Sequence, residues 1–185
     1  YEDSVRPAVS QGMPINILSD GAAFLWRLDA YGHGAPRSLW SDIRDYARPL
    51  YPNAGFAFAD VHMAMIAAAT GDLAAVAARA AALEQKIADG ALPAGPVIPA
   101  ICRALMDFAQ GDYAACANRL SPVAAEVERM GGSHAQREVV EDTLLVALMR
   151  SGETAAAGRL LDSRLHRRPS PRDLAWRTDL TAVNR

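Results

Sequence analysis

The chain has 185 residues, of which 51% are apolar, and its formal net charge is only -2. A chain of this length can bury a core of its own, and so small a charge excludes a general electrostatic attraction to nucleic acid or acidic membranes. No apolar run approaches the roughly 20 residues that cross a bilayer, and the sequence does not open with a secretory signal. We therefore expect a cytoplasmic protein without nucleic-acid or membrane partners.

Strong helix formers dominate the chain, whereas valine, isoleucine and threonine are sparse and period-two alternation is absent. This composition predicts helices and no sheet. Clusters of glycine and proline divide the chain into segments of ordinary helix length. In chain order, the pattern predicts helix pairs at about 20–31/37–49, 56–70/73–88, 97–110/113–129 and 134–150/153–167, and a last helix from 171.

Three segments share a pattern of glycine, an acidic residue and alanines: "TGDLAAVAAR", "QGDYAACANR" and "SGETAAAGRL". Their glycines, Gly71, Gly111 and Gly152, lie 40 and 41 residues apart, and Gly32 marks a degenerate copy 39 residues earlier. A period in this range is typical of stacked helical hairpins. Each glycine can end one helix in the left-handed conformation, and the acidic residue favours the start of the next helix. The predicted fold is an all-α, tetratricopeptide-like superhelix of antiparallel helix pairs, with residues 1–185 forming a single domain.

Four segments carry a family resemblance: "LSDGAAFLWRLDAYG", "FADVHMAMIAAATGD", "GGSHAQREVVEDTLLVALMRSG" and the ending "AAGRLLDSRLHRRP". On these segments the chain resembles the tetratricopeptide-repeat protein 38 family. The resemblance implies a curved, all-helical superhelix and no established reaction. Because members of that family are considerably longer, it also implies that these residues form the carboxy-terminal part of a longer chain.

The most polar of these segments begins with "GGSHAQRE", which has two interpretations. Ser133 and Gln136 have the spacing of a capping box, in which each side chain bonds the backbone amide of the other residue. This structural interpretation leaves the next residues unexplained. At helical spacing His134 faces Glu138, and an imidazole can bind a ligand or accept a proton. Arg137 likewise faces Glu141, so the four charged or ionisable side chains are candidate site residues.

A second candidate site lies in the apolar stretch "FADVHMAM", which contains Asp60 and His62. The two residues cannot point the same way on a helix, so they form no catalytic dyad. A lone histidine in an apolar helix is typically a hydrogen-bonded core residue. The alternative is that His62 faces the inner groove of the superhelix, where His134 could converge with it. Trp26 is most simply a core residue, or it lines the groove beside Arg27.

The two cysteines, Cys102 and Cys116, are too few for a disulfide scaffold and fit a reducing compartment. Cys102 lies nine residues before Gly111, and Cys116 lies five residues after it. In an antiparallel hairpin this places them about 6 Å out of register at a rise of about 1.5 Å per residue. We therefore expect two free thiols.

No phosphate loop, nucleophile elbow, dinucleotide fingerprint or histidine metal spacing is present, so we expect no cofactor or metal, and the sequence leans away from an enzyme. We expect a binding or scaffold protein whose concave groove holds a peptide, a protein partner or another copy of the chain. The alternative is an enzyme or small-molecule-binding protein with a pocket around His62 and His134. The candidate groove or pocket residues are Trp26, Arg27, Asp60, His62, His134, Arg137, Glu138 and Glu141.

Overall fold

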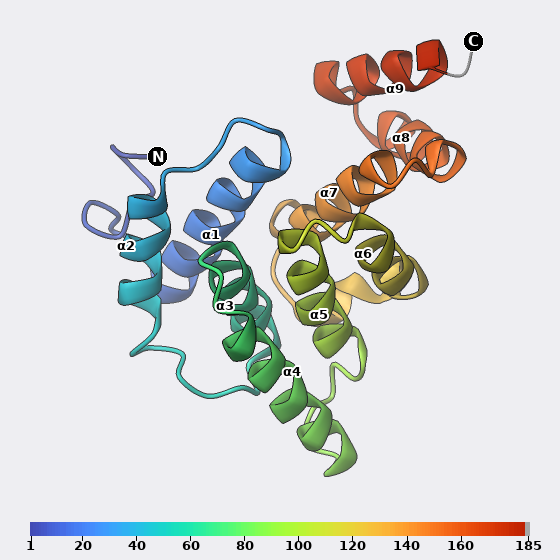
Figure 1. The fold of residues 1–185 in the computed structure, drawn as a ribbon. Helices are drawn as coiled ribbons and strands as arrows, with labels where there is room; N and C mark the ends of the chain where they lie inside the picture. The colour runs from blue at the N-terminus through green and yellow to red at the C-terminus, as the bar shows by residue number, and fades with distance from the viewer. Residues whose placement is uncertain (184–185) are drawn as a thin grey trace.

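The computed structural model describes residues 1–183, and every regular element in them is helical (Figure 1). The all-α expectation is thereby confirmed for this part of the chain. The α-helices are α1 Pro14–Ala30, α2 Arg37–Ala47, α3 Ala57–Ala69, α4 Leu73–Ala88, α5 Val97–Ala109, α6 Tyr113–Leu120, α7 His134–Arg150, α8 Thr154–Arg167 and α9 Pro171–Val183. A 3₁₀-helical segment, η1 Ser121–Met130, follows α6.

The turns after α1, α3, α5 and α7 have the same backbone geometry. After α3, Gly71 has a φ of +81° and donates its N–H to the carbonyl of Ala68 at 3.1 Å, while Asp72 donates to Ala67 at 2.8 Å. These two bonds satisfy carbonyls that the end of a helix would otherwise leave without a partner. The equivalent glycines are Gly32 at +84°, Gly111 at +79° and Gly152 at +80°.

An acidic side chain begins two of the helices that follow these turns. The carboxylates of Asp72 and Asp112 accept the backbone N–H groups of Ala75 and Ala115, each at 3.0 Å. Each bond satisfies one of the free amides in the first turn of the helix. Glu153 holds the equivalent position before α8 and makes no such bond, so it contributes only its charge.

Two helices differ from the expected boundaries. The first helix begins at Pro14 and not near residue 20, because a proline at the first helical position has its φ preset and needs no hydrogen-bond partner. The helix expected over 113–129 divides after Leu120. There Pro122 has no N–H to continue the helix, and the Ser121 hydroxyl donates to the Ala117 carbonyl at 2.7 Å. The chain then continues as η1.

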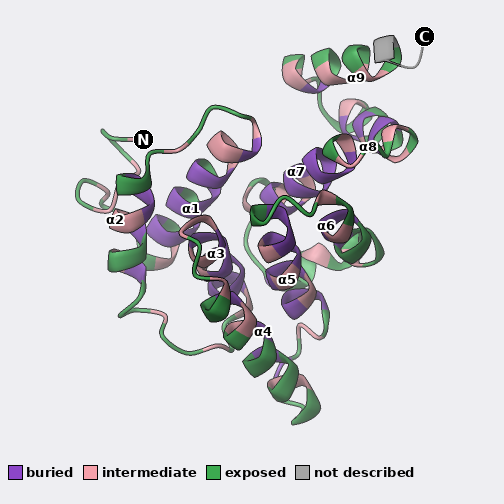
Figure 2. Ribbon diagram, in the orientation of Figure 1, coloured by how far each residue is buried: buried purple, intermediate pink, exposed green. Residues whose placement is uncertain are grey.

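The core lies where α1, α3, α5 and α7 pack against one another. Helix α1 contacts α3 and also α7, α3 contacts α5, and α5 contacts α7, so the four helices close a ring. Leu25, Met65, Ile101 and Leu145, one from each helix, are fully buried. Buried residues are concentrated on these helices, whereas α2 and α4 present exposed faces (Figure 2). The faces that an open groove would expose therefore cover each other.

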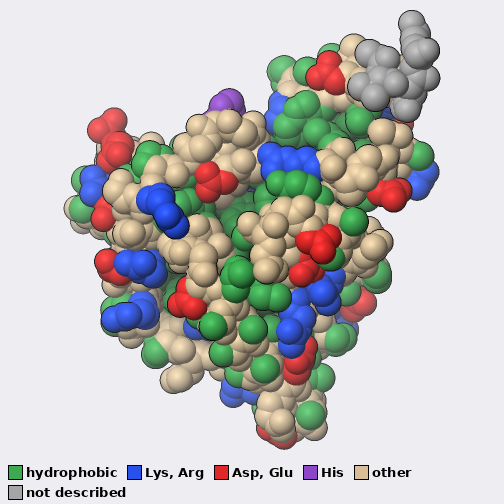
Figure 3. Space-filling model, in the orientation of Figure 1, with side chains coloured by type: hydrophobic (Ala, Val, Ile, Leu, Met, Phe, Trp, Pro, Cys, Tyr) green, Lys and Arg blue, Asp and Glu red, His purple; other side chains and the backbone are tan. Residues whose placement is uncertain are grey.

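The surface carries charges of both signs. Acidic and basic side chains are intermixed on the face shown in Figure 3, with no large field of one sign. This distribution agrees with the formal net charge of -2. Within residues 1–183, no helix combines the length and the apolar character needed to span a membrane.

Candidate binding cavity between η1, α7 and α8

The capping box predicted before α7 is present. The Ser133 hydroxyl accepts the Gln136 N–H at 3.3 Å, and the Gln136 side-chain oxygen accepts the Ser133 N–H at 2.8 Å. The Gln136 side-chain amide also donates to the Ser19 hydroxyl of α1 at 3.3 Å. The motif therefore fixes both the start of α7 and its attachment to α1.

The residues that follow the cap reach a cavity of about 260 Å³ between η1, α7 and α8. Four of the predicted site residues line it: His134, Arg137, Glu138 and Glu141. The chain leaves the α-helical path near Pro122, and small side chains of η1, those of Ala124 and Ala125, then line the cavity. Its apolar walls are Leu120, Val127, Val140, Leu144 and Leu160, together with Ala124 and Ala125.

The predicted pairing of Glu138 with His134 is absent, because arginines from the end of α8 and beyond reach the carboxylate. Arg168 donates to Glu138 at 2.9 Å, and Arg164 lies 3.5 Å from it. His134 is exposed and makes no hydrogen bond or ion pair within the described residues. Its imidazole is therefore free to contact a ligand.

The predicted pairing of Arg137 with Glu141 is also absent. Arg164 and Arg167 donate to the Glu141 carboxylate at 2.8 and 2.6 Å, and Arg137 instead donates to the carbonyl of Gly132. A nearly buried guanidinium such as that of Arg164 needs a carboxylate partner more than an exposed one does. The i, i+4 rule describes isolated helices, and here a neighbouring helix supplies stronger partners. Arg137 keeps a positive charge that no described carboxylate neutralises.

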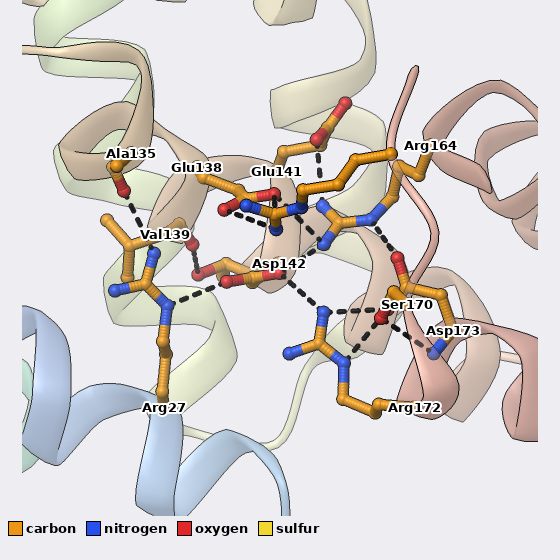
Figure 4. Close-up of polar contacts among 12 residues, drawn as sticks. Arg27, Ala135, Glu138, Val139, Glu141, Asp142, Arg164, Ser170, Arg172 and Asp173 are labelled. Carbon is orange, nitrogen blue, oxygen red and sulfur yellow. Dashed lines mark hydrogen bonds and ion pairs between the residues drawn. The ribbon is translucent and has the colours of Figure 1, made fainter. Parts of the chain in front are cut away.

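Behind this cavity lies a buried ion-pair cluster that sequence reasoning missed (Figure 4). Arg164 of α8 is 3% exposed and donates to Asp142 of α7 and to Asp173 of α9, each at 2.8 Å. Arg27 of α1 donates to the other oxygen of Asp142 at 2.7 Å. Burial opposes ionisation of Asp173, but hydrogen bonds from Arg164 and Arg172 outweigh it and hold the pKa of this carboxyl below its ordinary value. The cluster joins four helices.

The cluster left one signal in the sequence. Asp142 lies in the mostly apolar run "VVEDTLLVALM", between Glu141 and Thr143. A charged residue at a position that helical spacing buries requires a partner. The residue that pairs with it, Arg164, lies 22 positions later in a basic helix end, where arginine is ordinary. The sequence alone therefore does not identify the pair.

Asp60 and His62 lie in the core and away from this cavity. His62 is fully buried, and its Nδ1 donates to the Phe58 carbonyl at 2.7 Å, while Nε2 has no partner within the described residues. Burial lowers the pKa of His62 to about 4. Asp60 accepts the Gly55 N–H at 3.0 Å and pairs with Arg79 at 2.5 Å, and burial raises the pKa of its carboxyl. Asp60 therefore joins α3 to the preceding loop and to α4, whereas the hydrogen bond of His62 stays within α3.

Trp26 and Arg27 join α1 to α7. The Trp26 indole N–H donates to the Thr143 hydroxyl at 2.9 Å, in a buried contact, and Arg27 bonds Asp142. The interpretation of Trp26 as a core residue therefore fits its burial and its main contact. Its ring also lines a second, separate cavity.

The cysteines are free thiols, as expected, and both are buried. Burial raises the pKa of each thiol to about 12, so neither is a thiolate at neutral pH. Within residues 1–183, no group of three or more histidine, cysteine or acidic side chains is placed to hold a metal ion.

No family model matches the chain, and no solved structure matches it.

Proposed function

We propose that the chain is a tetratricopeptide-like helical-repeat protein that binds a segment of a protein partner, and that it is the carboxy-terminal part of a member of the tetratricopeptide-repeat protein 38 family. The four turns of equal geometry support the repeat, since each joins successive helices through a left-handed glycine. Two free, buried cysteines support a cytoplasmic location.

The single observation that supports binding is the cavity between η1, α7 and α8. Its volume of about 260 Å³ lies below the range of roughly 300–1,000 Å³ that is usual for pockets of drug-sized ligands. It suits one or two apolar side chains, which its walls of leucine, valine and alanine would contact. Because the inner ring of helices is closed, this outer cavity is a better binding site than the predicted concave groove.

The rim of the cavity explains how a peptide would be oriented. His134, Arg137 and Glu128 line it, and none of the three forms an ion pair with a described residue. Glu138 and Glu141 are already neutralised by arginines. An anchoring apolar side chain would enter between the walls, while these three polar groups, none of which has an ion-pair partner among the described residues, bond the peptide backbone and its neighbouring side chains.

The alternative of an enzyme with a pocket around His62 and His134 has no geometric support. His134 lines the cavity, whereas His62 is fully buried in the ring core and is not among the cavity's lining residues. Acid–base chemistry requires both groups within hydrogen-bond reach of one substrate, directly or through a water.

A substitution that fills the cavity tests the proposal. Peptides selected from a random displayed library would be measured against the wild type and against Ala124→Trp, which places an indole in the cavity from the exposed side of η1. We expect at least a tenfold loss of affinity. The matched control is Ala155→Trp, on an exposed position of α8 outside the cavity, which should bind as the wild type does. Equal affinity for all three proteins, or no selected peptide, would refute the site.

A further inference from the structure

A second cavity, of about 240 Å³, lies at the carboxyl ends of the four ring helices. The residues that matter for its chemistry are Trp26 and Asp29 of α1, Phe108 of α5, Tyr113 of α6 and Arg150 of α7. Ala68 and Ala69 supply the contribution of α3. The cavity is separate from the one between η1, α7 and α8, and none of its lining residues is shared with it.

Asp29 brings to this cavity a negative charge that no described cation neutralises. Its two carboxylate oxygens accept neutral donors, the Ala35 N–H at 2.5 Å and the Trp40 indole N–H at 2.9 Å. Each oxygen has capacity for a further hydrogen bond. No ion pair of Asp29 occurs among the described residues, although all but one of the chain's 19 lysine and arginine residues are arginines.

Arg150 brings a positive charge to the same cavity, also without a described carboxylate partner. Its guanidinium donates to the Tyr113 hydroxyl and to the Ala30 carbonyl, both at 2.8 Å, and lies 5.0 Å from the centre of the Tyr113 ring. Two of its five N–H donors are used in these bonds, so three remain. One cavity thus holds two opposite charges that are too far apart to pair with each other.

A continuous aromatic wall lies beside these charges. The ring centres of Trp26 and Phe108 are 5.3 Å apart, and those of Phe108 and Tyr113 are 5.2 Å apart. Figure 3 shows hydrophobic side chains gathered in a hollow between α1 and α5 on the face drawn there. An apolar or aromatic group packs favourably against such a wall.

We propose that this cavity binds a free α-amino acid with an apolar or aromatic side chain. The ammonium group lies toward Asp29, the carboxylate lies toward Arg150, and the side chain lies on the aromatic wall. The converging carboxyl ends of four helices favour the ammonium group, since their dipoles are negative there. Arginine is well suited to a carboxylate because its donors can bond both oxygens.

The charge arrangement selects a zwitterion over a simple ion. A simple cation would neutralise Asp29 but would be repelled by Arg150. A simple anion would neutralise Arg150 but would be repelled by Asp29. Only a ligand with both charges neutralises both side chains. The volume agrees with this choice: about 240 Å³ corresponds to about eight water molecules at roughly 30 Å³ each, which is the scale of an amino acid.

Calorimetric titration of the full 185-residue chain tests the proposal with four probes. L-Leucine and L-phenylalanine carry both charges, N-acetyl-L-phenylalanine lacks the ammonium group, and L-phenylalanine amide lacks the carboxylate. We expect at least one of the two amino acids to bind, and each modified probe to bind at least tenfold more weakly than L-phenylalanine. Absence of binding by both amino acids up to about 10 mM, or equal affinity for the modified probes, would overturn the proposal.

Variants assign the two charges to their side chains. Arg150→Gln should weaken L-phenylalanine at least tenfold and leave the already weak binding of the amide unchanged, because the amide has no carboxylate for Arg150 to bond. Asp29→Asn should weaken L-phenylalanine at least tenfold and leave the binding of N-acetyl-L-phenylalanine unchanged, because that probe has no ammonium group for Asp29 to bond. The Asp29→Asn variant keeps only one oxygen acceptor, so it can no longer accept from both the Ala35 N–H and the Trp40 indole N–H. If that variant fails to fold, Arg150→Gln decides the assignment. Arg159→Gln, an exposed arginine of α8, is the control and should bind as the wild type does. Equal losses for the amino acid and both modified probes would refute the assignment.

Discussion

The wild type should lose free energy of unfolding when the pH falls below neutral, because His62 is buried. Replacement of His62 by leucine should make the protein less sensitive to this acidification. His62 is fully buried in the ring of helices, with only its Nδ1 bonded. Burial is the main reason that its pKa falls from 6.5 to about 4. The hydrogen bond to Phe58 and the charge of Asp20 act against that fall, and Arg27 adds to it.

The sign and size of the effect follow from the two pKa values. The unfolded chain binds a proton at His62 near pH 6.5, while the folded chain binds it only near pH 4. Stability is therefore fully present above pH 6.5 and is lost as the pH falls toward 4. Proton linkage gives a loss of about 2 kcal/mol between pH 7 and pH 5, and about 3 kcal/mol in all. Asp60, whose pKa burial raises, acts in the opposite direction.

Urea denaturation at pH 7, 6 and 5 measures this loss. We expect His62→Leu to match or exceed the wild type at pH 7, because leucine removes a buried nitrogen that has no partner. Between pH 7 and pH 5 the variant should lose about 2 kcal/mol less than the wild type. His166→Gln, at an exposed position, is the control and should keep the wild-type slope. If His62→Leu loses as much as the wild type, burial of the imidazole does not perturb it as argued.

Three further results should follow from local geometry. Gly132→Ala should destabilise the protein by about 2–5 kcal/mol in thermal melts, because its φ is +76° and an added Cβ would collide with the Phe58 ring. The control Gly71→Ala, with a φ of +81° and no neighbour within 4 Å, should cost only about 1–2 kcal/mol. Equal losses for the two variants would refute the collision. Ser133→Ala should cost about 1 kcal/mol and His134→Ala less than about 0.5 kcal/mol, with the histidine variant weakening peptide binding. Both cysteines should resist a thiol reagent in the native protein and react in urea, and rapid native labelling would contradict their burial.

The sequence by itself determined the helices and the turns between them. The left-handed glycine at Gly71, the carboxylate cap at Asp72 and the capping box at Ser133 all formed as their residue types predict. These features depend on backbone conformation and hydrogen bonds within five residues of one another, so no distant partner is needed. The break at Pro122 is equally local, and the missing N–H of proline would have predicted it.

Only the tertiary structure decided which polar side chains meet. The sequence identified His134, Arg137, Glu138 and Glu141 as a group, and the structure places all four at one cavity. The sequence did not predict that arginines of α8 would replace the pairs expected within α7, since a partner on another helix has no fixed spacing in the chain.

The same reason explains the ring and the second cavity. Asp29 lies in α1 and Arg150 in α7, far apart in the chain, and they reach one cavity only because α1 packs against α7. His62 belongs to the core and not to a groove because that ring is closed. Local preferences determine where helices begin and end, but burial of their apolar faces determines which helices pack together, and that choice depends on every face at once.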